Sequence, residues 1–380
     1  MKIDRQNCIA SLLTARTAAA ISSIQLAGTG AEDILKRIFK SAAKQEPDFS
    51  QGRILHGFIF DAARDIDEVI IGCEGRDNFS INCHGNPLIV ENILELLKNH
   101  DVKIVEPNEM MIFLGRQKYG DNTIAIEADI SAAQSATYDG ARIIVHQTKA
   151  GLFDTAKKWL KASEQEDIKN EAKRILADSR IAEYFIKGAK IGIAGPPNSG
   201  KSTLFNYLCG RQKAIVADIA GTTRDWLSAQ IRLKKIMAEF FDTAGLDENL
   251  TAKNAIDVQS QAKAVELIKN CDIVLFVVDS TAWAKAHPTI LMNELVVFNK
   301  CDLAGELSFP GLKISAKTGE GITELIRVIE QKLNVADFEI KKTVCFTDRQ
   351  RKILRQIVKS DTKQQIDELI TELLNGDLSV

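Results

Sequence analysis

The feature that most constrains the fold is a glycine-rich segment of eight residues, Gly195-Pro-Pro-Asn-Ser-Gly-Lys-Ser202. It follows an apolar run typical of a buried strand, residues 190–194, and precedes a helix expected over residues 203–208. The segment matches the pattern G-x-x-x-x-G-K-[ST]. Its glycines let the backbone curl so that successive N–H groups face phosphate oxygens, and the N-terminus of the helix adds its positive end. The pattern therefore predicts a phosphate-binding loop between a strand and a helix.

Two side chains of this loop have a specific expected role. Lys201 should reach the β and γ phosphates of a nucleotide, and the Ser202 hydroxyl should ligate Mg²⁺. The nucleotide-binding residues predicted in the loop and at the start of the helix are Gly195, Asn198, Ser199, Gly200, Lys201, Ser202 and Thr203.

The chain around the loop alternates between strand-like and helix-like stretches. Buried strands are expected at residues 190–194, 237–241, 272–278, 294–298 and 312–314. Alternation of this kind is the signature of a doubly wound α/β domain. We expect that domain to span residues 189–337.

A second motif, Asp242-Thr-Ala-Gly245, ends the strand expected at 237–241. In a nucleotide-binding site of this type, Asp242 would hold Mg²⁺ through water and the N–H of Gly245 would contact the γ phosphate. Taken alone, the pattern D-x-x-G is also typical of an ordinary turn. Its position after a buried strand favours the functional interpretation.

The third and fourth motifs indicate guanine rather than adenine. Asn299-Lys-Cys-Asp302 follows the strand expected at 294–298, and the carboxylate of Asp302 can accept hydrogen bonds from guanine N1–H and the 2-amino group. Adenine has no such pair of donors. Lys300 can lie along the base, and Asn299 can brace the loops. Ser315-Ala316-Lys317, after the last expected strand, can supply a backbone N–H for guanine O6.

The segment Gly221-Thr-Thr-Arg-Asp225 lies where the mobile switch of such a site is expected. We expect Thr223 to ligate Mg²⁺ in the GTP state, with Thr222 as the alternative. Many GTPases carry a water-orienting glutamine after D-x-x-G, but Leu246 stands there and cannot polarise water. With backbone carbonyls near 217–221, the amide of Asn198 could instead hold a monovalent cation beside the phosphates, although Asn198 could also be an ordinary turn residue.

The rest of the chain predicts two further regions. Residues 1–120 mix short strands (21–26, 69–71, 79–83, 102–105) with helices (31–43, 87–98), which is typical of a small α+β domain. Residues 121–188 and 338–380 read as helices, with Thr347 or Asp348 as a cap. The expected architecture is an α/β P-loop GTPase domain inserted into a helical domain and preceded by a small α+β N-terminal domain.

Composition narrows the expected partners and location. Net charge is -2, so a strongly basic nucleic-acid-binding protein is not expected, DNA is not expected as a partner, and any RNA contact would be local or made through a partner. The seven cysteines are scattered without a C-x-x-C pair, which favours reduced thiols. The first seven residues are polar and no apolar run is long enough to cross a bilayer, so we expect a cytoplasmic protein with no signal peptide and no membrane partner.

These motifs resemble the bacterial tRNA-modification GTPase family, the MnmE or TrmE type. The resemblance lies in Gly195-Pro-Pro-Asn198, in Asp218-Ile-Ala-Gly-Thr-Thr-Arg-Asp225 and in Asp242-Thr-Ala-Gly-Leu246. It extends to Ile81-Asn-Cys-His-Gly-Asn-Pro87, which is similar to the I-N-C-H-G-G-P segment of that family's N-terminal domain, and to residues 176–188.

The resemblance implies potassium-stimulated GTP hydrolysis by G domains that meet across a homodimer. It also implies an N-terminal domain that dimerises and binds a folate derivative. A flavoprotein partner would act with the dimer on the wobble uridine of certain tRNAs. Asn198 then corresponds to the potassium ligand, and Asp257 lies near the position of the family's water-orienting acid.

The sequence departs from the family pattern at several positions. Thr17-Ala-Ala-Ala20 stands for a G-R-G-G loop, Gln25 for an arginine, and Glu74-Gly-Arg-Asp77 for T-G-E-D, which opposes folate binding. The family's C-terminal C-I-G-K motif is absent from residues 376–380. Three interpretations stay open: a tRNA-modification GTPase, a divergent regulatory or assembly GTPase without that chemistry, and a nucleotide-binding dimer scaffold with little turnover.

Overall fold

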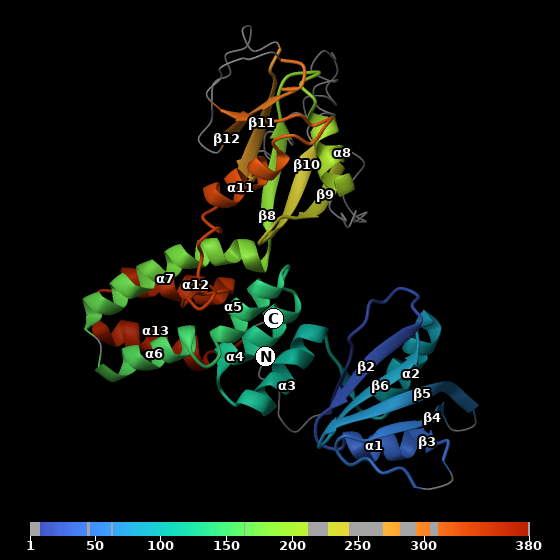
Figure 1. Ribbon diagram of the computed structural model, residues 1–380. Coiled ribbons are helices and arrows are strands. Elements are labelled where there is room, and N and C mark those ends of the chain that lie inside the picture. The colour runs from blue at the N-terminus through green and yellow to red at the C-terminus, as the bar shows by residue number, and fades with distance from the viewer. Residues whose placement is uncertain are drawn as a thin grey trace, which may run out of the picture. The chain divides into compact units, whose positions relative to one another are not determined.

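The computed structural model describes residues 8–43, 46–61, 64–162, 164–211, 227–242, 269–281, 294–304 and 311–378. The chain divides into two compact units, Met1–Ile130 with Thr371–Val380 and Ser131–Ile370. Figure 1 labels the helices and strands of both units.

The first unit is built on a seven-stranded sheet of order β3-β4-β5-β6-β2-β1-β7. Its strands are β1 (Ile9–Leu12), β2 (Ile21–Ala27), β3 (Phe39–Ser41), β4 (Ile54–Asp61), β5 (Arg64–Gly75), β6 (Asn78–His84) and β7 (Lys103–Ile104). All neighbours are antiparallel except β1 and β7. Two helices, α1 (Ala31–Ile38) and α2 (Pro87–Asn99), supply Leu35 and Ile93 to the core that one face of the sheet forms.

Alternation along the strands explains this core. In β6, Phe79, Ile81 and Cys83 are buried while the residues between them are not. Successive side chains of a strand point to opposite faces, so one face packs against the helices. This arrangement is the α+β fold expected for the N-terminal region.

The helix predicted over residues 31–43 is wrong in its second part. Helix α1 ends at Ile38, and Phe39 is extended, with φ of -115° and ψ of 131°. Phe39–Ser41 pairs with β4 through Phe39 and Ile59, and the Phe39 ring packs edge-on against Phe49 at 6.2 Å. A pairing between distant segments therefore overrides the local helical pattern.

Helices follow this sheet and return after the α/β segment. They are α3 (Pro107–Tyr119), α4 (Thr123–Ala133), α5 (Tyr138–His146), α6 (Gly151–Ala162), α7 (Gln165–Ile186), α12 (Asp348–Lys359) and α13 (Lys363–Asn375). Residue 120, the predicted end of the first region, lies in the turn between α3 and α4. In the described ranges, every helix is too short or too polar to cross a bilayer.

Contacts of α7 with α12 and with the segment leading into it join the two helical parts of the second unit. Cys345 N donates to Ser179 Oγ at 2.8 Å, and Arg351 pairs with Glu183 at 3.1 Å. Thr347 caps α12 by accepting from the N–H of Gln350. Figure 1 shows α12 beside α7, although the strands of the second sheet come between these two helices in the sequence. The α/β segment is therefore inserted into the helical part, as predicted.

The inserted segment forms a six-stranded sheet of order β13-β12-β11-β8-β10-β9. Its strands are β8 (Ala189–Ala194), β9 (Leu227–Arg232), β10 (Met237–Asp242), β11 (Ile273–Asp279), β12 (Glu294–Asn299) and β13 (Leu312–Lys313). Strand β9, which the sequence pattern did not predict, pairs antiparallel with β10, and the other pairs are parallel. Helices α8 (Lys201–Arg211) and α11 (Ile322–Lys332) belong to this domain.

The strand order explains where the site lies. The chain continues from β8 to one side of the sheet through α8, β9 and β10, and later to the other side through β11, β12 and β13. The carboxyl end of β8 is therefore a topological switch point, where α/β sheets leave a crevice for ligands. The glycine-rich loop occupies this end.

Candidate nucleotide-binding site

The glycine-rich loop connects β8 to α8 and is held close to neighbouring strands. Gly195 has φ of 143°, and a Cβ there would overlap the backbone oxygen of Val277 in β11. Gly200 has φ of 93°, and a Cβ there would overlap the amide of Asn299. Both positions therefore require glycine, for conformation as well as for space.

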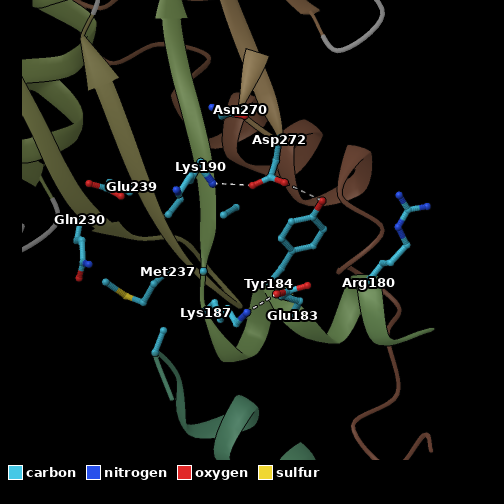
Figure 2. A pocket seen from close by; sticks show the side chains of 14 residues that line it. Arg180, Glu183, Tyr184, Lys187, Lys190, Gln230, Met237, Glu239, Asn270 and Asp272 are labelled. Carbon is cyan, nitrogen blue, oxygen red and sulfur yellow. Dashed lines mark hydrogen bonds and ion pairs between the residues drawn. The ribbon is translucent and has the colours of Figure 1, made fainter. Parts of the chain in front are cut away.

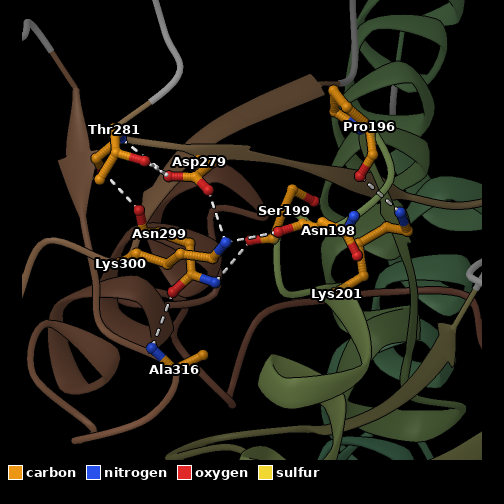
Figure 3. Close-up of polar contacts among 10 residues, drawn as sticks. Pro196, Asn198, Ser199, Lys201, Asp279, Thr281, Asn299, Lys300 and Ala316 are labelled. Atoms are coloured by element: carbon orange, nitrogen blue, oxygen red, sulfur yellow. Dashed lines mark hydrogen bonds and ion pairs between the residues drawn. The ribbon is translucent and has the colours of Figure 1, made fainter. Parts of the chain in front are cut away.

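Lys201 folds back over this loop. Its Nζ donates to the backbone oxygens of Gly195 at 2.8 Å and Pro196 at 2.9 Å (Figure 3), and the side chain is buried. Both acceptors are neutral carbonyls. Phosphate oxygens would be stronger partners for the ammonium, because they carry negative charge and add the attraction between opposite charges.

Asn299, at the end of β12, is buried and bridges two loops. Its Nδ2 donates to the backbone oxygen of Ser199 at 2.8 Å, and its Oδ1 accepts from the N–H of Ala316 at 2.9 Å (Figure 3). The amide thus joins the glycine-rich loop to the loop after β13. The N–H of Ser315 donates to Glu320 O at 3.0 Å. A guanine O6 would accept a hydrogen bond from the N–H of Lys317, or it would replace the present acceptor of the Ser315 or Ala316 N–H.

Lys300 reaches across to the glycine-rich loop and also pairs with a carboxylate. Its Nζ donates to the backbone oxygen of Asn198 at 2.7 Å and lies 2.6 Å from Asp279 Oδ2. Asp279 Oδ1 accepts from both the N–H and the hydroxyl of Thr281, at 2.9 and 2.7 Å. Burial acts to raise the pKa of Asp279, but the hydrogen bonds from Lys300 and Thr281 outweigh it and hold that pKa below its usual value.

Asp279 was not among the predicted site residues. It belongs to no motif of the sequence, although its position at the end of the strand expected at 272–278 was a usable signal. Ends of parallel strands gather at one edge of a sheet, so a carboxylate that ends β11 lies near the loops after β8 and β12.

The structure places the other predicted residues at the same edge. Asp242 is the last residue of β10, is buried, and pairs in register with Ile193 of β8. Ser202 is exposed in the first turn of α8, and Asp302 is exposed in the turn after β12. Hydroxyl and carboxylate oxygens are the ligands that Mg²⁺ accepts, so Ser202 and Asp242 fit such an ion chemically.

Comparisons with known proteins agree with this geometry. The family model described as "50S ribosome-binding GTPase" matches residues 190–303, and the model described as "GTP-binding protein TrmE N-terminus" matches residues 8–111. The tRNA modification GTPase MnmE of Akkermansia muciniphila is 30% identical over 371 residues, which cover 86% of this chain and 81% of that protein.

The chain belongs to the MnmE/TrmE family of tRNA modification GTPases.

Two other relatives cover a similar extent. The probable MnmE of Cyanidioschyzon merolae is 28% identical over 92% of this chain and 86% of its own length. The MnmE of Aquifex aeolicus is 27% identical over 98% of this chain and 90% of its own length. The family resemblance, the fold class and the identification as a GTP-hydrolysing P-loop enzyme are thereby confirmed.

Several predicted residues of this MnmE-family chain lie outside the described residues. They are Thr222, Thr223, Gly245, Leu246, Asp257 and the carbonyl groups of residues 217–221. Their roles in Mg²⁺ binding, phosphate sensing, cation binding and water orientation stay predictions. Among the described residues, no group of three or more His, Cys, Asp or Glu side chains could hold a metal ion. The Mg²⁺ predicted here would instead depend on hydroxyl, carboxylate and nucleotide oxygens.

A cavity of about 470 Å³ lies where helix α7 meets the sheet of the GTPase domain (Figure 2). Tyr184 Oη donates to Asp272 Oδ1 at 3.2 Å, and Asp272 Oδ2 accepts from the N–H of Lys190 at 2.8 Å. Burial, with a further contribution from Asp272, raises the pKa of Tyr184 to about 12. These bonds attach the end of α7 to β8 and to the residue before β11.

At position 25, the residue present does not fit the folate site that the family resemblance implies. Gln25, which stands where the family has an arginine, is buried, and its Nε2 donates to Glu74 Oε2 at 3.0 Å and Asn78 Oδ1 at 2.6 Å. Both donors of this amide are engaged within the protein. The position therefore offers no cation to an anionic ligand.

Cys83 and His84 of this unit do not form a nucleophile–base pair. Cys83 is buried and its Sγ contacts the backbone oxygen of Ser22 at 3.6 Å, whereas His84 is exposed and its Nδ1 lies 2.8 Å from Asp67 Oδ1. Burial, with Asp67 as a lesser cause, raises the pKa of the Cys83 thiol to about 11. Neighbouring residues of a strand point to opposite faces, so the two side chains cannot act together.

Proposed function

We propose that this MnmE-family GTPase hydrolyses GTP with Mg²⁺ and K⁺ and acts in the modification of the wobble uridine of tRNA. The observation that carries the proposal is the extent of the similarity to proteins named tRNA modification GTPase. The match to the A. aeolicus protein covers 98% of this chain and 90% of that protein, so it includes the N-terminal and helical parts as well as the GTPase domain.

Phosphate and Mg²⁺ are assigned to one edge of the sheet. Lys201 would exchange its two carbonyl acceptors for oxygens of the β and γ phosphates. Ser202, Thr223 and Asp242 would hold Mg²⁺, which would neutralise charge on the transferring phosphoryl group. Gly245 would donate its N–H to the γ phosphate.

Guanine is assigned to the loop after β12. Asp302 is exposed in that loop and would accept hydrogen bonds from N1–H and the 2-amino group. Lys300 would lie along the base while its Nζ stays on the backbone oxygen of Asn198, 2.7 Å away. The loop of Ser315, Ala316 and Lys317 would close the other side of the base.

Charge compensation during hydrolysis is assigned to K⁺ held by Asn198. This residue has φ of 61°, a left-handed conformation, and its side chain is exposed at the glycine-rich loop. With carbonyls of residues 217–221, its amide oxygen would hold a monovalent cation close to the β and γ phosphates. A fixed positive charge there stabilises the transition state in the same way as an arginine. Asp257 is the candidate for orienting the attacking water.

The proposed partners follow from the family. They are a second copy of this chain, a flavoprotein subunit of tRNA modification, and tRNA, all in the cytoplasm. The alternative is a divergent regulatory or assembly GTPase without modification chemistry. The observation that favours the alternative is the internally paired Gln25, which replaces a cation in the N-terminal domain.

Mass spectrometry of wobble uridines decides between these two functions. We expect tRNA from cells without this gene to lose a carbon-5 aminomethyl-type modification, and the wild-type gene to restore it. Lys201→Ala should fail to restore it, because the phosphate contacts are lost. Lys234→Ala, at an exposed lysine of the turn between β9 and β10, is the matched control and should restore it. If cells without this gene, and without another gene of the family, keep the wild-type modification profile, the alternative is favoured.

A further inference from the structure

Asp279 occupies a central place among the loops of the GTPase site. It ends β11, which lies between β8 and β12 in the sheet, and it pairs in register with Asn299. Strand β8 continues into the glycine-rich loop and β12 continues into the guanine loop. The carboxylate of Asp279 therefore stands between the part of the site for phosphate and the part for the base.

Both carboxylate oxygens of Asp279 have a defined partner. One accepts two hydrogen bonds from Thr281, at 2.9 and 2.7 Å, and the other lies 2.6 Å from Nζ of Lys300 (Figure 3). The same Nζ donates to the backbone oxygen of Asn198 at 2.7 Å. The contacts thus form a continuous chain from Thr281 through Asp279 and Lys300 to the glycine-rich loop.

The backbone at both ends of the last bond is unusual. Lys300 has φ of 63° and Asn198 has φ of 61°. Residues other than glycine rarely adopt this left-handed backbone conformation. Such conformations persist where the surroundings hold them. Here the bond from Lys300 Nζ joins the two residues, and Asp279 fixes the position of that ammonium.

We propose that Asp279 is a positioning residue that couples guanine recognition to the phosphate loop through Lys300. The carboxylate holds the ammonium against the backbone of Asn198, so that Lys300 is aligned for the base while Asn198 is aligned for the cation. This role rests on the proposed assignments of Lys300 to guanine and of Asn198 to K⁺. It adds to the known motifs a residue that lies outside all of them.

The test compares Asp279→Asn with the wild-type full chain. The asparagine keeps an oxygen for Thr281 and removes the charge that holds Lys300. We expect affinity for a fluorescent GDP analogue to fall roughly tenfold, because a hydrogen bond to a charged group is lost. The K⁺ concentration for half-maximal GTP hydrolysis should rise severalfold, a change that a loss of fold stability alone would not produce.

A double-mutant cycle shows whether Asp279 acts through Lys300. In a Lys300→Gln background, Asp279→Asn should have little further effect on GDP affinity, because coupled residues are not additive. Thr281→Val should weaken GDP binding in the same direction but less, and it serves as the second variant if Asp279→Asn does not fold. Glu239→Gln, at a carboxylate of β10 that lines the cavity beside α7, is the matched control and should behave as wild type.

Wild-type GDP affinity in Asp279→Asn, or fully additive effects in the cycle, would overturn the role of Asp279. If K⁺ fails to stimulate the wild-type protein, the assignment of the cation to Asn198 is wrong. The GDP cycle still decides the role of Asp279 in that case, so the two failures are distinguishable.

Discussion

Nδ2 of Asn299 donates a hydrogen bond of 2.8 Å to the backbone oxygen of Ser199, across 100 residues of sequence. The bond joins the last residue of β12 to the loop that follows β8. Since its Oδ1 also accepts from the N–H of Ala316, Asn299 links three of the predicted motifs. The shape of the nucleotide site therefore depends on a side chain that need not touch the nucleotide.

Asn299→Ala should weaken nucleotide binding and lower stability. The substitution leaves a buried carbonyl and a buried N–H without their partner, which costs about 1–3 kcal/mol for each group. Calorimetric titration with GDP and thermal unfolding measure the two effects. Asn270→Ala, at an exposed amide of the same domain, should change neither. Equal GDP affinity in wild type and Asn299→Ala would contradict the bridging role.

Asp302→Asn should weaken GTP binding and admit xanthosine triphosphate. The amide no longer accepts from both guanine donors, but its NH₂ can donate to the additional oxygen of xanthine. Competition of both triphosphates against a fluorescent nucleotide measures the exchange of specificity. If the variant keeps wild-type affinity for GTP, the guanine assignment is wrong.

GTP hydrolysis should be much faster in KCl than in NaCl at equal ionic strength. Asn198→Ala should remove the difference, because the amide oxygen that would hold the cation is lost. Release of phosphate, followed in both salts, measures the effect. Equal rates in the two salts for the wild-type protein would exclude the cation mechanism.

Tyr184→Phe should lower the free energy of unfolding by about 1 kcal/mol, the usual net contribution of one hydrogen bond. The variant loses the bond from Tyr184 Oη to Asp272, which attaches α7 to the GTPase domain. Urea unfolding measures the loss, with Tyr138→Phe, at an exposed tyrosine, as the control. An unchanged midpoint in Tyr184→Phe would show that the bond contributes nothing to stability.

The titration of His84 should depend on Asp67. The hydrogen bond that His84 donates to Asp67 and the negative charge of Asp67 raise the pKa of His84 above the ordinary value, so the protonated ring is favoured in the folded protein. The stabilisation is fully present below the pKa of the unfolded chain and is lost as pH rises through the raised pKa of the folded state. NMR titration of Asp67→Asn should show the His84 pKa returning toward its ordinary value, and an identical titration in both proteins would contradict the pairing.

The local sequence pattern was sufficient to predict most strands of the GTPase domain. The strand expected at 237–241 lies within β10 (Met237–Asp242), and the one expected at 294–298 lies within β12 (Glu294–Asn299). Each is a mostly apolar run that contains one glutamate and ends at a motif with its own chemistry. Mostly apolar runs of this length predict strands that are largely covered on both faces of a sheet.

Segments whose state depends on distant partners could not be predicted in this way. Phe39–Ser41 continues a helical pattern but pairs with β4, and β9 forms as the antiparallel edge beside β10. In both segments, hydrogen bonds to another strand outweigh local preference, which spans only about 1 kcal/mol per residue.

The sequence by itself determined the phosphate loop, the guanine motif and the family, because each is a contiguous set of residues with fixed spacing. Only the tertiary structure decided that Asp279 meets Lys300 and that Asn299 holds Ser199 to Ala316. It also decided that the donors of Gln25 are already engaged. These relationships join residues far apart in the chain, and the order and register of the strands bring them within hydrogen-bonding distance.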